Sequence, residues 1–197
     1  MSGKPQFDEP TVIAAALDVF WRHGYAGTSI SQLTEATGLS RSSLYQRFGD
    51  KDGLFQEALS AYIDRVMQRA LAVRAATPRD RLEALLREFL PREGRSRKPP
   101  GCLLARSGSE LVDIPAAGQA LVVDGLRRQR AMLEDVLREA VAQRQLAPDT
   151  NVAALSWHYL GVLQAILNLP QAGATAAELG GVVDAAMTAW PRRTPAR

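Results

Sequence analysis

Several residue types are scarce in this chain of 197 residues, and each scarcity excludes a class of protein. There is one cysteine, Cys102, so neither an internal disulfide nor a multi-cysteine zinc site can form, and we expect a reducing cytoplasm. Aromatic residues make up 6% of the chain, and 13 Val and 5 Ile stand against 31 Ala and 25 Leu. Because β-branched and aromatic residues favour strands while Ala and Leu favour helices, this balance predicts an all-α protein.

Signal sequences and the signature motifs of enzymes are also missing. The N-terminus, MSGKPQFDEP, has no apolar stretch of the kind that a signal peptide needs. The chain has no GxGxxG, P-loop, HExxH or GxSxG motif, and its two histidines are far apart in the sequence. We therefore expect neither an enzyme nor a metal site, and no cofactor. The net charge of +3 is compatible with nucleic acid binding but does not decide it.

Prolines and glycines divide the chain into about nine predicted helices. Pro10, Ser29, Ser40, Asp50 and Thr77 are suited to open or cap a first turn. The helices are expected at about 10–24, 30–37, 41–47, 51–75, 78–90, 102–111, 116–146, 152–169 and 176–190. The proline-rich and basic stretch 91–100 is expected to be a loop.

The segment 152–169 is apolar nearly all round. It is too short for a membrane span and contains polar residues such as Ser156, His158 and Gln164. A helix that is apolar on all sides in a soluble protein is buried on two sides. We therefore expect this segment to pack both within the chain and against a second copy.

Residues 28–48 carry the most informative pattern. Two short helices joined by a tight turn at Gly38 are typical of a helix-turn-helix. The outward face of the second helix then carries Arg41, Ser42, Ser43, Gln46 and Arg47. Because such a helix enters the major groove of DNA with its N-terminus first, the residues at its start are placed to reach base edges.

A longer pattern with fixed spacing runs through these helices. Its positions are Phe20, Trp21, Gly24, Tyr25, Thr28, Ser29, Ile30, Leu33, Gly38, Ser40, Leu44, Tyr45, Phe48, Asp50, Lys51, Leu54 and Phe55. The pattern resembles that of the TetR family of bacterial transcriptional regulators. The resemblance implies phosphate contacts from Thr28, Ser29, Tyr45 and Lys51, and base reading by the residues that follow Ser40.

The resemblance also implies a division of labour along the chain. Residues 1–55 would form a helix-turn-helix DNA-binding domain of three helices, and 56–197 a helical domain that binds an effector and forms a homodimer. The implied partners are a palindromic double-stranded operator, an unidentified small molecule and a second copy of the chain, with no membrane.

Two further sets of residues are candidates in the second half. The candidates for an effector pocket are Tyr62, Met67, Phe89, Cys102, Leu103, Met132, Trp157 and Tyr159. Each of them can equally be plain core, since apolar residues on helices usually are. The candidates for the dimer interface are Leu155, Tyr159, Gly161, Leu163, Ile166, Gly180, Val183 and Met187.

Cys102 is open to two interpretations. A helix N-terminus and the basic neighbours Arg97, Lys98 and Arg106 could lower its pKa and make it a sensor of oxidants or electrophiles. We favour the alternative, a small buried core residue.

The function best favoured by the sequence is a repressor that a ligand releases from DNA. The alternatives are a cysteine-based sensing regulator and a helical enzyme or carrier without DNA binding. The sequence does not determine the effector, the operator, or whether the regulation is repression or activation.

Overall fold

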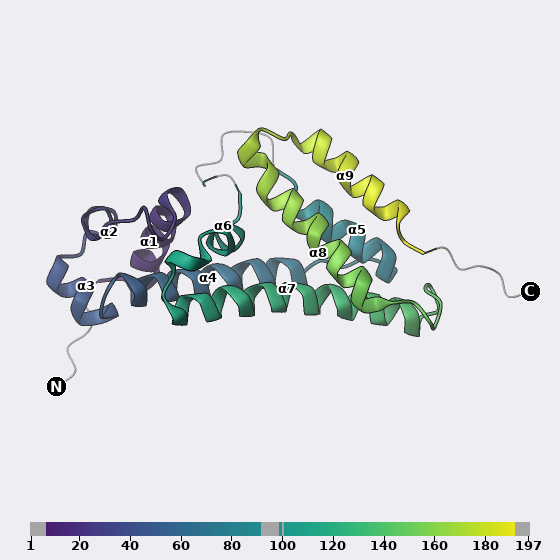
Figure 1. The fold of residues 1–197 in the computed structure, drawn as a ribbon, viewed down its shortest axis with the longest axis horizontal. Coiled ribbons are helices and arrows are strands. Elements are labelled where there is room, and N and C mark those ends of the chain that lie inside the picture. Colours follow the sequence, from purple (N-terminus) through teal and green to yellow (C-terminus); the bar gives the residue numbers. More distant parts are fainter. Residues whose placement is uncertain (1–6, 92–98, 100, 192–197) are drawn as a thin grey trace, which may run out of the picture. The chain divides into compact units, whose positions relative to one another are not determined.

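The computed structural model describes residues 7–91, 99 and 101–191, and every regular element among them is a helix (Figure 1). The elements are α1 (Glu9–His23), α2 (Ile30–Thr37), α3 (Arg41–Phe48), α4 (Lys51–Leu71), α5 (Pro78–Glu88), α6 (Leu103–Ser109), η1 (Leu111–Asp113), α7 (Ala116–Ala142), α8 (Val152–Asn168), η2 (Leu169–Ala172) and α9 (Ala176–Thr188). The all-α class is therefore confirmed. Most of the predicted loop 91–100 lies outside the described residues.

Side-chain caps begin the helices where the sequence predicts them. The Ser29 hydroxyl accepts a hydrogen bond from the backbone N–H of Gln32 at 3.2 Å, and Gln32 Oε1 accepts from the backbone N–H of Ser29 at 2.8 Å. The Ser40 hydroxyl accepts from a backbone N–H in the first turn of α3 at 3.1 Å. Asp50 accepts from the backbone N–H of Gly53 at 2.8 Å. These bonds satisfy donors that the first turn of a helix leaves unpaired.

Several helices end earlier than predicted. The end of α7 is at Ala142 rather than near 146, because Arg144 adopts a φ of 61° and the N–H of Leu146 turns back to the Ala140 carbonyl at 3.2 Å. The end of α4 is at Leu71 rather than near 75, and α5, α6 and α9 are each a few residues shorter than expected.

Contacts divide the chain into two compact units. Unit 1 comprises the described residues within 1–65 and 97–125, and unit 2 those within 66–96 and 126–197. Helices α4 and α7 each contribute a segment to both units. The polypeptide therefore passes from one unit to the other more than once.

The core of unit 1 is built on aromatic edge contacts. The Phe55 ring of α4 meets the Phe20 ring at 5.1 Å and the Tyr25 ring at 5.0 Å between centroids, both in edge-to-face geometry. Trp21 meets Tyr62 in the same manner at 5.0 Å. Such pairs add to the free energy gained by burial. They place α1 against the N-terminal half of α4.

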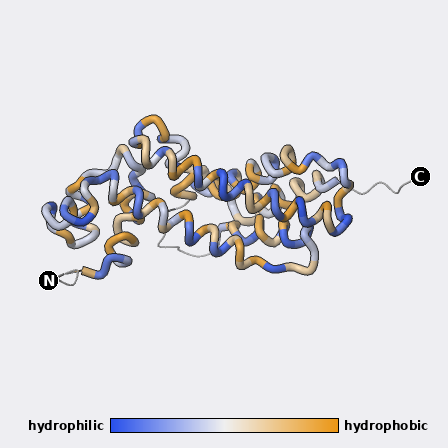
Figure 2. Tube along the Cα trace, turned by 90° about the horizontal axis from the view of Figure 1, so that it is seen from below, coloured by the Kyte–Doolittle hydropathy of each residue, from blue (hydrophilic) through white to orange (hydrophobic). Residues whose placement is uncertain are grey.

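The core of unit 2 lies between α5, α8 and α9, which pack on one another (Figure 1). Its fully or nearly fully buried side chains include Leu82, Leu85, Leu86, Tyr159, Leu163, Ile166, Leu179, Val183 and Met187, and the part of α7 in this unit adds Leu133 and Leu137. Figure 2 shows hydrophobic and hydrophilic residues alternating along the helices, as expected of helices with one buried face.

Candidate nucleic-acid interface

The helix-turn-helix predicted at 28–48 is formed by α2 and α3. Gly38 ends α2 with a φ of 70°, in the left-handed region that favours glycine, and its N–H donates to the Thr34 carbonyl at 3.0 Å. Ser40 then caps α3 two residues later. The turn is short because one residue both ends the first helix and reverses the chain.

Buried leucines and a phenylalanine hold the two helices in place. Leu33 of α2 and Leu44 of α3 have no exposed surface, while Leu39 in the turn and Phe48 at the end of α3 are less than a tenth exposed. Because these positions occupy one side of α3, the opposite side is left to solvent. The orientation of α3 thus follows from the packing of its apolar residues.

The solvent face of α3 carries the residues predicted to read DNA. Arg41, Ser42, Tyr45, Gln46 and Arg47 are exposed, and Ser43 is half-buried. Tyr45 is 46% exposed, so its ring is available at the surface rather than packed in the core. The structure therefore brings all six of these predicted residues onto one helix.

The residues at the start of α3 make neutral contacts with other described residues. Arg41 Nη2 donates to the Ser31 hydroxyl at 3.3 Å, and the hydroxyls of Ser42 and Ser43 each lie 2.9 Å from the Ser40 hydroxyl. No carboxylate among the described residues pairs with Arg41 in these contacts. The positive charge of Arg41 and the two hydroxyls are thus presented together at the helix start.

Two residues expected to contact phosphates, Thr28 and Lys51, make hydrogen bonds within the protein. Thr28 is 3% exposed and its hydroxyl donates to the Gly24 carbonyl at 2.6 Å. Lys51 is half-buried, with Nζ 4.2 Å from the Tyr25 ring centroid and donating to the carbonyls of Tyr25 and Thr28 at 3.2 and 3.3 Å. Both side chains hold the turn between α1 and α2. Ser29 is exposed but serves as the N-cap of α2.

Arg106 of α6 and Glu110, the C-cap residue of that helix, hold the same turn. The sequence alone did not predict this role. Arg106 donates to the Arg22 carbonyl at 3.2 Å and to Glu110 at 3.0 Å. Glu110 in turn accepts from the backbone N–H of Tyr25 at 2.9 Å. The i,i+4 spacing of Arg106 and Glu110 was the available signal, but it cannot say which distant backbone the pair will contact.

The predicted pocket residues fall into both compact units. Tyr62, Cys102 and Leu103 belong to unit 1, and Met67, Phe89, Met132, Trp157 and Tyr159 belong to unit 2. All are buried except Trp157, which is 59% exposed. In unit 2, Met132 lines a cavity of about 120 Å³ together with Leu71, Arg74, Arg81 and Asp135.

Cys102 lies in the interior of unit 1, without exposed surface. Burial raises the pKa of its thiol, and hydrogen bonds with Tyr62 and with backbone groups of α6 offset only part of that effect. Of the basic neighbours expected to lower this pKa, Arg97 and Lys98 lie outside the described residues. Arg106 points to the end of α1 instead. The geometry favours the core interpretation.

Most of the predicted dimer residues are buried within unit 2 of a single chain. Tyr159, Leu163, Ile166, Val183 and Met187 are at most 5% exposed, so they have almost no surface to offer a partner. The remaining three stay accessible: Gly161 is exposed, while Leu155 and Gly180 are half-buried. A Cβ at Gly161 or Gly180 would meet nothing within 4 Å.

Comparison with known proteins identifies the architecture that carries this helix-turn-helix. Residues 12–58 match the model of bacterial regulatory proteins of the tetR family, and residues 78–188 match that of the tetracyclin repressor-like C-terminal domain. The chain belongs to the TetR family. Its two matched regions cover most of its length, and the resemblance noted from the sequence is confirmed.

Two curated TetR-family relatives align along most of their length. The HTH-type transcriptional repressor ComR of Escherichia coli K12 is 29% identical over 202 residues, covering 96% of this chain and 92% of ComR. The HTH-type transcriptional regulator YezE of Bacillus subtilis 168 is 30% identical, covering 79% of this chain and 82% of YezE.

One similar solved structure contains operator DNA. A cysteine mutant of the TetR family transcriptional regulator CifR, in complex with 26-bp double-strand operator DNA, superimposes with a TM-score of 0.82. It is 32% identical and covers 96% of this chain and all of the CifR chain. This chain is therefore a DNA-binding transcription regulator, and not the helical enzyme or carrier considered as an alternative.

One segment of this TetR-family chain, Val152–Ala172, is long and apolar enough to cross a membrane by length and composition alone. It comprises α8 and η2, and α8 packs against α5 and α9 in unit 2. Since the relatives are transcription regulators, we assign the segment to a soluble protein, in which 33% of its apolar window is buried within the chain.

Proposed function

We propose that the chain is a homodimeric repressor of the cytoplasm that binds a palindromic operator through α3 and is released by a small-molecule effector. The observation that carries this proposal is the exposed face of α3, where Arg41 and the hydroxyls of Ser42 and Ser43 stand at the helix start and bond to hydroxyl groups of other described residues. An arginine can donate two hydrogen bonds to guanine, and a serine can donate or accept. Residues 1–55 serve DNA binding in this proposal, and 56–197 serve the effector and the dimer.

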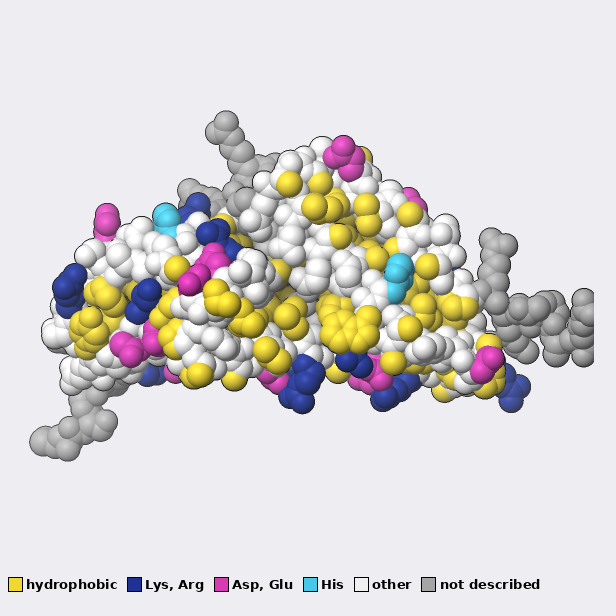
Figure 3. Space-filling model, in the orientation of Figure 1, with side chains coloured by type: hydrophobic (Ala, Val, Ile, Leu, Met, Phe, Trp, Pro, Cys, Tyr) yellow, Lys and Arg dark blue, Asp and Glu magenta, His cyan; other side chains and the backbone are white. Residues whose placement is uncertain are grey.

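The proposed dimer face is the solvent side of α8 and α9. On α8 it carries Ala154, Trp157 and Gly161, which are exposed and spaced three and four residues apart. Trp157 packs its ring under the guanidinium of Arg130 at 4.7 Å but remains 59% exposed. Figure 3 shows hydrophobic side chains gathered over these two helices. A large exposed aromatic among small residues suits close contact with a second copy.

The proposed effector site lies in 56–197. The cavity lined by Met132 lies in this region and is small. Its volume of about 120 Å³ is well below the roughly 300–1,000 Å³ of sites for drug-sized ligands. An effector of that size therefore requires a second arrangement of these helices. It would release DNA only through its higher affinity for that arrangement.

The experiment that tests the proposal is selection of operator sequences from a random duplex library by the purified chain. We expect the selected sequences to be near-palindromes with half-sites about 34–36 Å apart or somewhat wider, since the two recognition helices of a dimer occupy successive major grooves. Selected sequences without two-fold symmetry would contradict the dimeric arrangement. Binding that survives Arg41→Ala, Ser42→Ala and Gln46→Ala together would contradict the role of α3.

A further inference from the structure

Arg47, on the last turn of α3, is bound by a carboxylate from another helix. Its Nε donates to Glu9 Oε2 at 2.8 Å, and its Nη2 donates to Glu9 Oε1. Glu9 opens α1, 38 positions earlier in the chain. The pair is bidentate, a geometry in which both oxygens of the carboxylate and one edge of the guanidinium are used.

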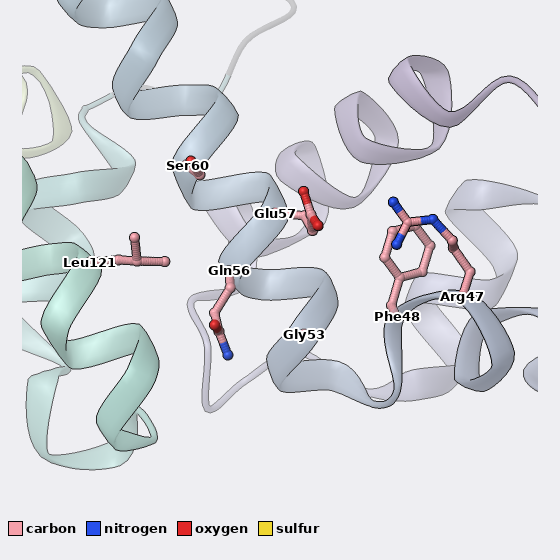
Figure 4. A pocket seen from close by; sticks show the side chains of 7 residues that line it. All are labelled: Arg47, Phe48, Gly53, Gln56, Glu57, Ser60 and Leu121. Atoms are coloured by element: carbon pink, nitrogen blue, oxygen red, sulfur yellow. The ribbon is translucent and has the colours of Figure 1, made fainter.

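Other groups of unit 1 fix the same guanidinium. It lies 4.9 Å from the Phe48 ring centroid, and the two side chains run beside each other on one side of an open cleft of about 430 Å³ (Figure 4). Glu57 of α4 lines that cleft as well. The hydrogen bond with Glu9 raises the pKa of Arg47, and the charge of Glu57 adds to it. Arg47 is thus bonded to one carboxylate and feels the charge of a second.

The other cations near α3 are placed differently. Arg41 donates to a neutral hydroxyl, that of Ser31. Lys51 is half-buried against Tyr25 and donates to backbone carbonyls. On the solvent face of α3, a carboxylate therefore offsets the charge of Arg47, whereas Arg41 donates to a neutral hydroxyl.

We propose that Glu9 is an intramolecular counterion that restrains Arg47 and thereby limits the affinity of the chain for DNA. This inference rests on the proposed function, in which α3 lies on the duplex. A DNA phosphate that approaches Arg47 must either displace Glu9 or bind a pair without net charge, and the carboxylate itself repels it. Glu9 acts through Arg47 and touches no base.

The test measures binding to a fluorescein-labelled duplex of random sequence, roughly 30 bp long and thus about three helical turns. A random duplex is sufficient because contacts to phosphate do not depend on sequence. Fluorescence anisotropy at several KCl concentrations gives the affinity and its salt dependence. The proteins are the wild type, Glu9→Gln, Arg47→Ala and the double variant.

We expect Glu9→Gln to bind about two- to fivefold more tightly, the range set by one exposed ion pair. The slope of log affinity against log salt should become steeper by about one, since one further phosphate contact is gained. In the Arg47→Ala background, Glu9→Gln should change the affinity no more than the control substitution Glu35→Gln does. Thermal unfolding by circular dichroism verifies that each variant is folded.

The matched control is Glu35→Gln, which removes one negative charge from an exposed position on α2. Equal effects of Glu9→Gln and Glu35→Gln would overturn the inference, because loss of any charge would then suffice. Weaker binding by Glu9→Gln would overturn it too, since Glu9 would be aiming Arg47 at the DNA. A wild type without salt-dependent binding would instead refute the α3 interface itself, which separates the two failures.

Discussion

The carboxylate of Glu110 accepts a hydrogen bond from the backbone N–H of Tyr25 at 2.9 Å. The residue before Tyr25 is Gly24, which has a φ of 74°, and a Cβ added to it would lie 2.3 Å from the Glu110 oxygens. A long-range contact, separated by 85 positions in the chain, therefore fixes the turn that leads from α1 into the helix-turn-helix. The positive φ favours glycine at this position, and any larger residue would also have to displace the Glu110 carboxylate.

Gly24→Ala is expected to destabilise unit 1. The alanine would have to adopt a positive φ and displace the Glu110 carboxylate, so the free energy of unfolding should fall by about 1–3 kcal/mol. Urea unfolding followed by circular dichroism measures it. Gly108→Ala on α6 is the control, since a Cβ there meets nothing within 4 Å, and it should be neutral or stabilising by up to about 1 kcal/mol. Equal losses in both variants would show that the turn does not depend on Gly24.

Arg41→Ala is expected to weaken binding to the selected operator by roughly 1–3 kcal/mol while changing binding to random DNA little, if Arg41 reads a base. Lys51→Ala should instead lower affinity for both duplexes by similar factors, because Lys51 holds the turn that leads into the helix-turn-helix. It should also lower the unfolding temperature, because its ammonium group holds the carbonyls of Tyr25 and Thr28. Electrophoretic mobility shift with both duplexes makes the measurement. Equal losses on the two duplexes for Arg41→Ala would show that it contacts the DNA backbone alone.

Cys102 is expected to react slowly with alkylating reagents near neutral pH. Its thiol has no exposed surface, and burial raises its pKa, so little thiolate is present and access is blocked. Iodoacetamide labelling followed by mass spectrometry should be much slower in buffer than in urea. Cys102→Ser should leave DNA binding and its release unchanged. A wild type that leaves DNA under mild oxidant, beside a Cys102→Ser variant that does not, would establish the cysteine-sensing alternative.

In the Tyr159→Phe variant, the free energy of unfolding is expected to fall less steeply with rising alkaline pH than in the wild type. The hydroxyl is buried without a hydrogen-bond partner among the described residues, and burial raises the pKa of Tyr159 to about 12 from a usual 10.0. Between these values the unfolded chain releases the proton and the folded chain keeps it, so stability falls as pH rises. Urea unfolding at several pH values between about 9 and about 12, a range that includes both pKa values, should show a shallower fall in the variant. An unchanged slope would mean that Tyr159 does not titrate differently on unfolding.

Gly161→Trp is expected to convert the chain to a monomer. The glycine is exposed on α8, and a Cβ there meets nothing within 4 Å of the same chain, so the substitution spares the fold of unit 2 and obstructs a partner. Sedimentation velocity measures the oligomeric state, and Gly108→Trp in unit 1 is the control. A Gly161→Trp protein that stays dimeric and still binds a full palindrome would place the interface elsewhere.

The local structure of this chain follows from its sequence. Capping residues such as Ser29 and Ser40, the left-handed glycine at 38 and the periodicity of apolar residues each act within a few positions, so the helices and the helix-turn-helix were predictable. The outward face of α3 was predictable for the same reason, since burial of Leu44 and Phe48 fixes which side remains exposed.

Tertiary structure decided which predicted side chains are available. Thr28 and Lys51 fit a phosphate-binding pattern, but packing turns both toward the α1–α2 turn. Leu163 and Ile166 lie on an apolar helix that suits a dimer, yet both are buried within one chain, where α8 packs on α5 and α9. The partners of Arg47 and Tyr25, which are Glu9 and Glu110, come from distant positions in the sequence. Helical periodicity gives the direction of a side chain around its own axis, whereas the group that it meets depends on how separate helices pack.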